Sequence, residues 1–399
     1  MATLARPFAA GALTMYTAAP GSDTRLLARL TSRRPLEERG GSVRGTLELV
    51  SGSYPRFLFG GGIDGILPVF HFHEVTADFL EPRLRFLAEN GYRTVTTDAV
   101  IRFVRDGVAP PPRSVVLTFD DAWVSQWTVA GPLLRRYGMS ATVFVIPARL
   151  EDAAGVRPTI DDGGAEIPGG SIFATWPELQ ALHASGVFDV QSHSRSHAVM
   201  FCEPELAGFV APGYERLSVM ERPLKTAGEC VALVGPDELG TPLFPTRSRL
   251  SAARRFIPDE AATARCRQAV AAGGGGAFFA RAAWEDELRR AYGQAAGRTE
   301  TAAARAAAIR DELAIAREIL QARFRTTVRS IALPWGVAGE ETRRALTASG
   351  YDIAFAESLW RLRAVARGDH PFGLMRLNGK FLTCLPGRGR RWFFTAVGS

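Results

Sequence analysis

The sequence predicts an α/β protein in which parallel strands form a sheet or a barrel. From Leu67 onward, short runs of β-branched and apolar residues alternate with segments of helical pattern, which is the order of repeated βα units. One of these runs, Ser-Val-Val-Leu at 114–117, is typical of a buried strand. A hydrophobic content of 46% over 399 residues is enough for one large core.

The predicted elements follow one another closely along the chain. Strands are expected at 67–72, 93–97, 114–119, 141–146, 187–191, 329–334 and 351–356, and helices at 78–90, 99–106, 124–137, 176–185 and 340–349. A parallel arrangement brings the carboxyl ends of these strands to one face, where the active sites of such proteins form.

The alternation is interrupted between residues 201 and 325. This stretch contains proline-rich turns, a glycine run and a long helix, so we expect a largely helical insertion or cap. In the long helix, apolar residues recur at helical spacing at Ile309, Leu313, Ala316, Leu320 and Phe324. We therefore expect an N-terminal extension at 1–65, an α/β domain at 66–380 that contains the insertion, and a C-terminal tail at 381–399.

Charge and composition exclude several classes of function. The net charge of +7 comes from arginines that are spread along the chain without a basic and aromatic cluster, so we do not expect nucleic-acid binding. No segment has the roughly 20 apolar residues of a membrane span, so no transmembrane segment is predicted. The four cysteines show no C-x-x-C spacing. Because the N-terminus lacks a clear secretory core, we expect a cytoplasmic protein, with export by an unrecognised signal as the alternative.

Two carboxylates stand at the end of a predicted strand, in Thr118-Phe119-Asp120-Asp121. Like charges this close repel each other, so one carboxylate is expected to bind a cation while the other acts as a base. An ordinary solvated turn is the alternative for an Asp-Asp pair.

Two histidines follow another predicted strand, in His193-Ser194-Arg195-Ser196-His197. If the chain turns helical here, both imidazoles lie on one face and can reach one divalent metal. This motif and the Asp-Asp pair both lie where strands end, so they can converge on one face of the sheet. Two structural histidines are the alternative.

Two further motifs lie at strand ends. In Phe70-His71-Phe72-His73, strand alternation points both histidines to the same face, where one of them could donate a proton. We expect His71 to be a hydrogen-bonded structural residue. Leu333-Pro334-Trp335-Gly336 combines a sharply turned backbone with a large apolar side chain, which alone is typical of a turn.

Taken together and in this order, the motifs resemble those of the polysaccharide deacetylases of carbohydrate esterase family four. The resemblance covers about residues 66–200 and 325–380. It implies a distorted (β/α)7-type barrel, to which the insertion and the N-terminal extension are added. Phe72-His73-Glu74-Val75 precedes the other motifs, and in this respect the chain is similar to the circularly permuted branch that includes poly-N-acetylglucosamine deacetylases.

The resemblance implies a catalytic base at Asp120 and a metal site formed by Asp121, His193 and His197. The metal is expected to be Zn²⁺, with Co²⁺, Mn²⁺ or Ni²⁺ as alternatives. The resemblance also implies that His73 donates a proton to the leaving amine.

The turn Leu333-Pro334-Trp335 corresponds to the family's third motif. The resemblance implies that the Trp335 side chain lines an acetyl pocket and that its backbone N–H helps to form an oxyanion hole. The family commonly has an arginine two residues before the proline, where this chain has Ala332. Arg376, in a last predicted strand at 374–378, is a candidate to orient Asp120 instead, and an ordinary surface salt bridge is the alternative.

The resemblance implies a metal-dependent hydrolase that removes an N-acetyl or similar acyl group from an amino sugar, in a polysaccharide, an oligosaccharide or a glycolipid precursor. An amidohydrolase of a non-sugar amide or a cyclic imide would use the same metal set. A catalytically silent glycan-binding protein is a second alternative, and it would not need a base, an acid and three ligands. Nothing in the sequence predicts the oligomeric state.

Overall fold

The computed structural model describes residues 24–30, 54–168, 172–227, 231–294, 296–356 and 363–397. Most of the predicted N-terminal extension therefore lies outside the described residues. The chain divides into two compact units. The larger unit contains the described residues of 33–200, 247–255 and 299–399, and the smaller unit contains the remainder.

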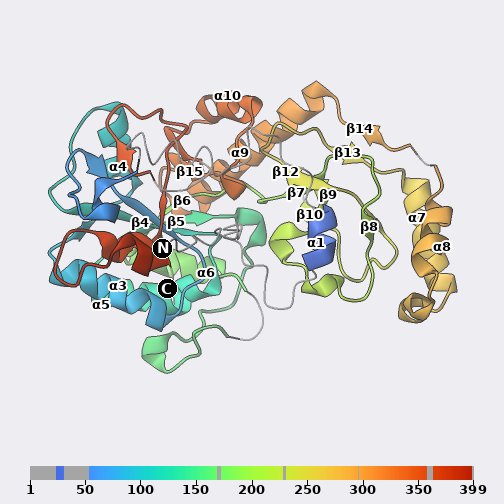
Figure 1. Ribbon diagram of the computed structural model, residues 1–399, viewed down its shortest axis with the longest axis horizontal. Helices are drawn as coiled ribbons and strands as arrows, with labels where there is room; N and C mark the ends of the chain where they lie inside the picture. The colour runs from blue at the N-terminus through green and yellow to red at the C-terminus, as the bar shows by residue number, and fades with distance from the viewer. Residues whose placement is uncertain are drawn as a thin grey trace, which may run out of the picture. The chain divides into compact units, whose positions relative to one another are not determined.

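The larger unit is built on an eight-stranded sheet whose registered strand pairs are all parallel. Along the sheet the order is β16, β15, β6, β5, β4, β2 and β18, and β3 also pairs with β4 (Figure 1). Their bounds are β2 (Val69–Phe72), β3 (Arg93–Thr94), β4 (Ser114–Asp120), β5 (Ala141–Val145), β6 (Phe188–Ser192), β15 (Ser330–Ala332), β16 (Ile353–Phe355) and β18 (Leu377–Asn378).

The sheet curls until its two ends meet. Leu374, just ahead of β18, forms a parallel bridge with Phe355 in β16. The ring of strands is thus closed by one bridge instead of a full ladder, which is why the barrel is distorted. This topology confirms the predicted α/β barrel class.

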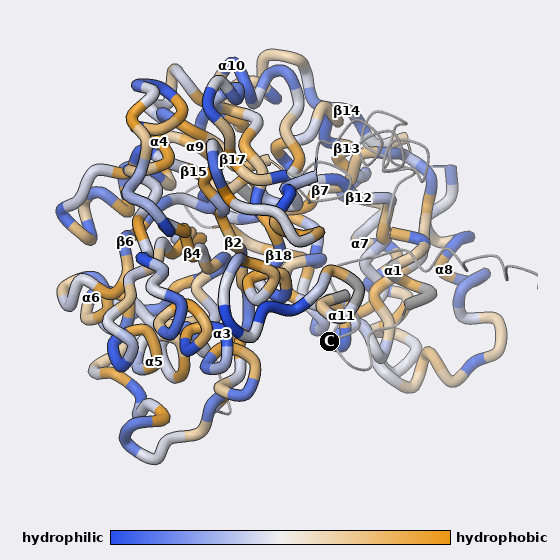
Figure 2. Tube along the Cα trace, turned by 60° about the vertical axis from the view of Figure 1, so that its left-hand side comes forward, coloured by the Kyte–Doolittle hydropathy of each residue, from blue (hydrophilic) through white to orange (hydrophobic). Residues whose placement is uncertain are grey.

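Helices flank the barrel strands (Figure 1). They are α3 (Ala77–Glu89), α4 (Thr97–Arg105), α5 (Gly131–Arg136), α6 (Trp176–Ala184), α9 (Ala302–Phe324) and α10 (Glu340–Ala348). At the start of helix α6 the Glu178 carboxylate accepts the backbone N–H of Thr175 at 2.8 Å, which satisfies one N–H at the helix N-terminus. In Figure 2 the hydrophobic colour follows the strands, in agreement with the complete burial of β2, β4 and β5.

The helix predicted at 124–137 is divided into two parts. A π-helix, η3 (Gln126–Ala130), precedes α5. Pro132 has no N–H to continue the hydrogen-bond ladder of a single α-helix, which is a physical reason for the change at this point.

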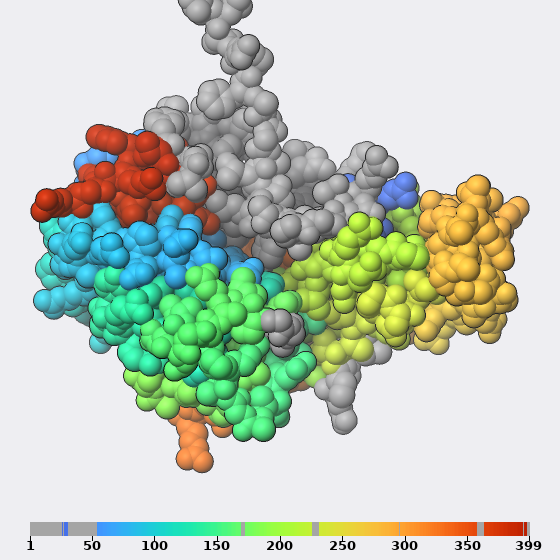
Figure 3. All heavy atoms as spheres, turned by 90° about the horizontal axis from the view of Figure 1, so that it is seen from below, coloured from blue at the N-terminus to red at the C-terminus, as the bar shows by residue number. Residues whose placement is uncertain are grey.

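The residues after β18 pack along the side of the barrel. The 3-10 helix η10 (Gly379–Cys384) contacts α3 and the 3-10 helix η2 (Arg56–Phe59). Figure 3 shows this C-terminal segment in red against residues of the N-terminal half in blue. The Arg390 guanidinium donates to the carbonyl oxygens of Phe57, Gly60 and Gly61, and so fixes the contact.

The smaller unit contains both helices and short strands. Its helices are α1 (Thr24–Leu30), α7 (Glu260–Ala272) and α8 (Trp284–Tyr292), and its strand pairs are β8 (Gly208–Phe209) with β11 (Pro242–Leu243) and β9 (Leu224–Ala227) with β10 (Val231–Leu233). A core that includes Phe244, Phe256 and Tyr292 holds these elements together. The limits of the predicted domains stay a prediction.

Helix α9 falls within the predicted insertion but groups with the barrel, where it contacts β6. Among the helices that the structure describes, none has the length and apolar character needed to cross a membrane. Cys266 and Cys384 are free thiols, and Cys230 lies outside the described residues.

Candidate active site and metal centre

The Asp120-Asp121 pair lies at the carboxyl end of β4, with both side chains buried. The backbone leaves the strand through two consecutive left-handed residues, Asp121 with φ of 71° and Ala122 with φ of 62°. Non-glycine residues rarely adopt this conformation, and such strain concentrates at functional sites. Ser194, His197 and Trp335 also have left-handed backbone conformations. The turn gives the two carboxylates different neighbours.

Asp121, His193 and His197 form a compact group in which one ligand atom of each residue lies within 4.8 Å of the others. The Oδ1 atom of Asp121 is 3.2 Å from Nε2 of His193 and 3.9 Å from Nε2 of His197. All three side chains are buried. Two imidazoles and one carboxylate form the ligand set of many catalytic zinc sites, which leave one position open.

Neighbouring groups fix the orientation of these side chains. The Nδ1 atom of His193 is 2.7 Å from the carbonyl oxygen of Ala332, which directs Nε2 toward Asp121. The indole N–H of Trp123 donates to Oδ2 of Asp121 at 2.8 Å, on the side away from the histidines. Such contacts hold metal ligands in position and set the histidine tautomer. Trp123 was not identified from the sequence.

The residues fit a divalent cation. Neither ring nitrogen of His197 has a hydrogen-bond partner among the described residues, although the side chain is completely buried. A buried imidazole without such a partner is costly unless another group, such as a metal, binds it. Burial, together with the nearby His193, lowers the pKa of His197 to about 3, so it is neutral as a ligand must be. Burial alone would raise the pKa of Asp121, but His193 and His197 lower it to about 2.

The histidine motif does not form the helical turn that would place both rings on one helix face. Residues 193–197 are a loop between β6 and β7 (Val199–Phe201). Left-handed conformations at Ser194 and His197 fold this loop back on itself, and the two ring centroids are 4.8 Å apart. The expected convergence on Asp121 is present, but the backbone reaches it by a different route.

Asp120 is held by Arg376. The guanidinium donates to Oδ1 at 2.6 Å and to Oδ2 at 2.7 Å, and one of its nitrogens also donates to Thr118 Oγ1 at 3.1 Å. The Arg376 side chain is only 8% exposed, so this is not a surface salt bridge. Its guanidinium lies over the rings of Phe144 and Phe355 inside the barrel.

The charge state of Asp120 follows from these contacts. Burial would raise the pKa of this carboxyl, but the Arg376 guanidinium, with His193 and His73, holds it well below its usual range. Asp120 is therefore ionised at neutral pH.

His73 follows β2 and faces Asp120, with Nε2 3.7 Å from Oδ2. Its side chain is 27% exposed, whereas the predicted metal ligands are buried, so it can meet a molecule that arrives from solvent. The backbone around His73 contacts the start of the π-helix: Ser125 Oγ, directly before η3, accepts the Val75 N–H, and the Gln126 amide lies 3.5 Å from the carbonyl of His73. π-helices are frequent at functional sites, but no sequence pattern predicts them.

His71, His73 and Asp120 also lie close enough together to be considered as metal ligands. Both oxygens of Asp120, however, already accept hydrogen bonds from Arg376. A cation placed there would meet a buried guanidinium, and the like charges would repel each other. The group around Asp121 is therefore the better metal site.

The Leu333-Pro334-Trp335 turn borders the metal group on the other side. Leu333 and Pro334 are buried, and Trp335 is partly exposed with φ of 61°. The Trp335 ring lies 5.0 Å from the ring of His197. The turn thus forms an apolar wall next to the predicted ligands.

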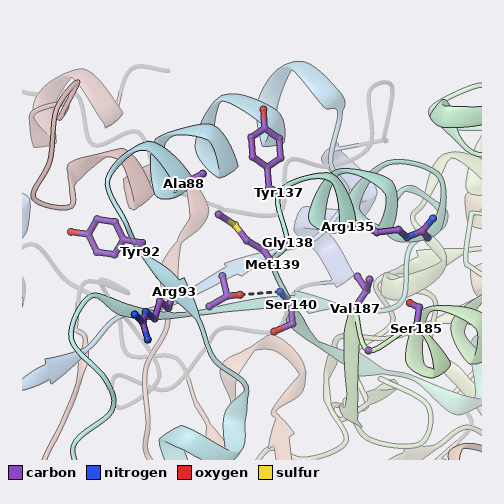
Figure 4. Close-up of a pocket in the computed structure, with 12 residues that line it drawn as sticks. Ala88, Tyr92, Arg93, Arg135, Tyr137, Gly138, Met139, Ser140, Ser185 and Val187 are labelled. Atoms are coloured by element: carbon purple, nitrogen blue, oxygen red, sulfur yellow. Dashed lines mark hydrogen bonds between the residues drawn. The ribbon is translucent and has the colours of Figure 1, made fainter.

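A hollow of about 630 Å³ lies elsewhere, at the amino ends of the strands (Figure 4). Its lining includes Arg93 at the start of β3, Ser140 just before β5 and Val187 just before β6. No predicted site residue lines it. The predicted catalytic and metal-binding side chains, such as Asp120, Asp121 and His193, lie at the opposite, carboxyl ends of the strands.

The fold and this arrangement of residues define an α/β barrel with a candidate metal site at the carboxyl ends of its strands. Residues 107–212 match the polysaccharide deacetylase family. The matched segment includes Asp120, Asp121, His193 and His197. This segment therefore has the sequence of a polysaccharide deacetylase domain, the family that the motifs resemble.

Two curated relatives are similar over part of their length. One is YxkH of Bacillus subtilis (strain 168), which is named as a polysaccharide deacetylase. It is 30% identical to this chain over 88 residues, which are 20% of this chain and 32% of YxkH. The poly-β-1,6-N-acetyl-D-glucosamine N-deacetylase of Escherichia coli (strain K12) is 28% identical over 123 residues, which are 31% of this chain and 18% of the relative. The chain thus matches about a third or less of these relatives.

A solved structure, the deacetylase domain of BpsB from Bordetella bronchiseptica, has a similar fold. Its TM-score is 0.50 and its sequence is 19% identical, over 80% of this chain and 97% of that chain. At this identity the likeness supports the barrel fold and nothing more specific.

Proposed function

We propose that this protein is a metal-dependent deacetylase that hydrolyses the N-acetyl group of an amino sugar within a glycan. The observation that carries the proposal is the division of the Asp-Asp pair. Asp120 binds Arg376 and faces His73, whereas Asp121 faces His193 and His197. A hydrolase needs both a metal ligand and a separate base, and these two neighbours provide them.

In this proposal Asp121, His193 and His197 hold the cation, with Zn²⁺ as the first candidate because of the nitrogen and carboxylate ligands. When bound, a divalent cation supplies a Lewis acid that polarises the amide carbonyl and lowers the pKa of water. The buried ligand set and the Trp335 wall limit solvent access on this side of the site.

The other residues of the chain move the protons. Asp120 is ionised and accepts a proton from the attacking water. His73 lies 3.7 Å from Asp120 and is partly exposed, so it is positioned to give a proton to the departing amine. The backbone N–H of Trp335, at the turned position, donates to the developing oxyanion. The products are acetate and a free amino sugar.

The test is an acetate-release screen with the purified protein. Chitooligosaccharides, β-1,6-linked N-acetylglucosamine oligomers, lipid-linked or nucleotide-linked N-acetyl sugars and non-sugar amides are each assayed with and without a chelator. We expect release from at least one N-acetylated sugar, loss with the chelator and recovery with Zn²⁺. Release from the non-sugar amides alone would replace the sugar substrate with the amidohydrolase alternative. Full activity after verified metal removal would end the proposal.

A further inference from the structure

The loop that carries both histidines receives support from a helix distant in sequence. The backbone carbonyl oxygen of Glu312, on α9, accepts a hydrogen bond of 3.0 Å from the N–H of Arg195. Its carboxylate accepts the Ser196 N–H at 3.0 Å and the Ser196 hydroxyl at 2.5 Å. One residue of α9 thus accepts three hydrogen bonds from two of the three positions between His193 and His197.

The position of Glu312 is unusual for a carboxylate. It lies on the buried face of α9 beside Ile309, Leu313 and Ala316, and it is only 6% exposed. Burying a charged group costs free energy unless its oxygens are hydrogen-bonded. Here both carboxylate oxygens accept hydrogen bonds from Ser196. A carboxylate placed in a helix core to bind one loop indicates that the geometry of that loop has to be fixed.

The loop needs such support because its backbone is strained. Ser194 and His197 have φ of 62° and 53°, and neither is a glycine. Local contacts, such as the His197 N–H on Ser194 Oγ at 3.1 Å, bind one half of the loop to the other. They do not anchor the loop to the rest of the barrel. Glu312 does so on one side, and Arg149, which donates to the Ser196 carbonyl at 3.1 Å, does so on the other.

We propose that Glu312 is a positioning residue that acts through Ser196 to hold His193 and His197 in the geometry required for metal binding. This inference rests on the proposed function, because it gives the histidines the role of ligands. It extends the site to α9, a helix outside the segment that matches the family. The carboxylate does not contact the metal or the substrate. It determines how well the two imidazoles are preorganised.

The test measures Zn²⁺ affinity of the metal-free protein by competition with a chromophoric chelator, alongside thermal unfolding. Loss of groups that orient metal ligands typically weakens binding by about 10- to 100-fold, which is the effect expected for Glu312→Ala. Glu312→Gln keeps an acceptor for the Ser196 N–H, so it should recover most of the affinity. Glu318→Ala, at an exposed position of the same helix, should change nothing.

A second control separates positioning from simple stability. Leu320→Ala removes a completely buried side chain from the same face of α9, eight residues beyond Glu312. It should lower the melting temperature but leave Zn²⁺ affinity unchanged. The inference is overturned if Glu312→Ala binds Zn²⁺ as tightly as the wild type, or if Leu320→Ala weakens binding equally. A wild-type protein that binds no divalent metal would instead overturn the proposed function, and this inference with it.

Discussion

Arg376 and Asp120 form a bidentate ion pair across 256 positions of sequence, with N–O distances of 2.6 and 2.7 Å. Paired N–H donors of this kind fix the plane of a carboxylate as well as its charge. The family resemblance implies an arginine where the chain has Ala332, and the Arg376 side chain reaches the base instead from the position directly before β18. We therefore propose Arg376 as the residue that orients Asp120.

Replacing Arg376 tests this role. Arg376→Met should lower kcat by about 100-fold, because small displacements of a catalytic group have effects of that size. Removing the guanidinium also raises the pKa of Asp120, and a base must be deprotonated. The acidic limb of the pH–rate profile should therefore move to higher pH. Arg376→Lys should restore part of the rate. An unchanged pH profile in Arg376→Met would show that Arg376 has a structural role only, and the exposed Arg343→Met is the matched control.

His73 is tested by its dependence on the leaving group. His73→Ala should reduce amide hydrolysis by about 10²- to 10⁴-fold, the usual contribution of a general acid. The leaving group of an activated ester such as p-nitrophenyl acetate departs as an anion and needs no proton. The hydrolysis rate of this ester should therefore fall much less. The two rates are compared in the same preparation, with the exposed His370→Ala as a control. An equal loss on both substrates would contradict a proton-donor role.

Glu178 provides a pH-dependent test of stability away from the metal group. Arg157 donates to its carboxylate at 2.6 and 2.7 Å, and the Thr175 N–H also donates to it. Burial would raise the pKa of Glu178, but these hydrogen bonds lower it below the ordinary value of 4.5. The folded state therefore gains stability above pH 4.5 and loses it as the pH falls through the folded pKa.

Glu178→Gln should accordingly lower the free energy of unfolding by about 2 kcal/mol at pH 7, the scale of a hydrogen bond to a charged group. The difference from the wild type should shrink at pH values well below 4.5. Urea unfolding at pH 7 and at pH 3 measures both quantities. A difference that is the same at both pH values would refute the ionic contribution, and Glu318→Gln at an exposed site should show none.

The strands were predictable from sequence because each is a short apolar run bounded by polar residues. The run 114–119 matches β4, and the run 141–146 matches β5, within one residue at either end. Placing motifs at strand ends then brought Asp121, His193 and His197 together, since parallel strands end on one face. Pattern and topology predicted this convergence, whereas the choice of Asp121 as ligand and Asp120 as base came from the family resemblance.

The remaining contacts depend on the tertiary structure. Whether Arg376 binds Asp120 or faces solvent is decided by how the last strand returns to the barrel, and the sequence contains no signal for that. Glu312 is one polar residue on an otherwise apolar helix face, which could have drawn attention to it, but its partner lies 116 residues away. The π-helix and the left-handed turns at Asp121 and Ala122 occur without glycine, the residue that would have indicated them.

The central claim is that two adjacent carboxylates have separate tasks, with Asp121 binding the metal and Asp120 accepting the proton. The most direct measurement determines metal content and acetate release in Asp120→Asn and Asp121→Asn side by side. We expect Asp120→Asn to retain about one equivalent of metal and to lose about 10²- to 10⁴-fold in turnover. Asp121→Asn should lose both metal and turnover. Metal loss in Asp120→Asn, or turnover within about tenfold of the wild type in that variant, would contradict the account.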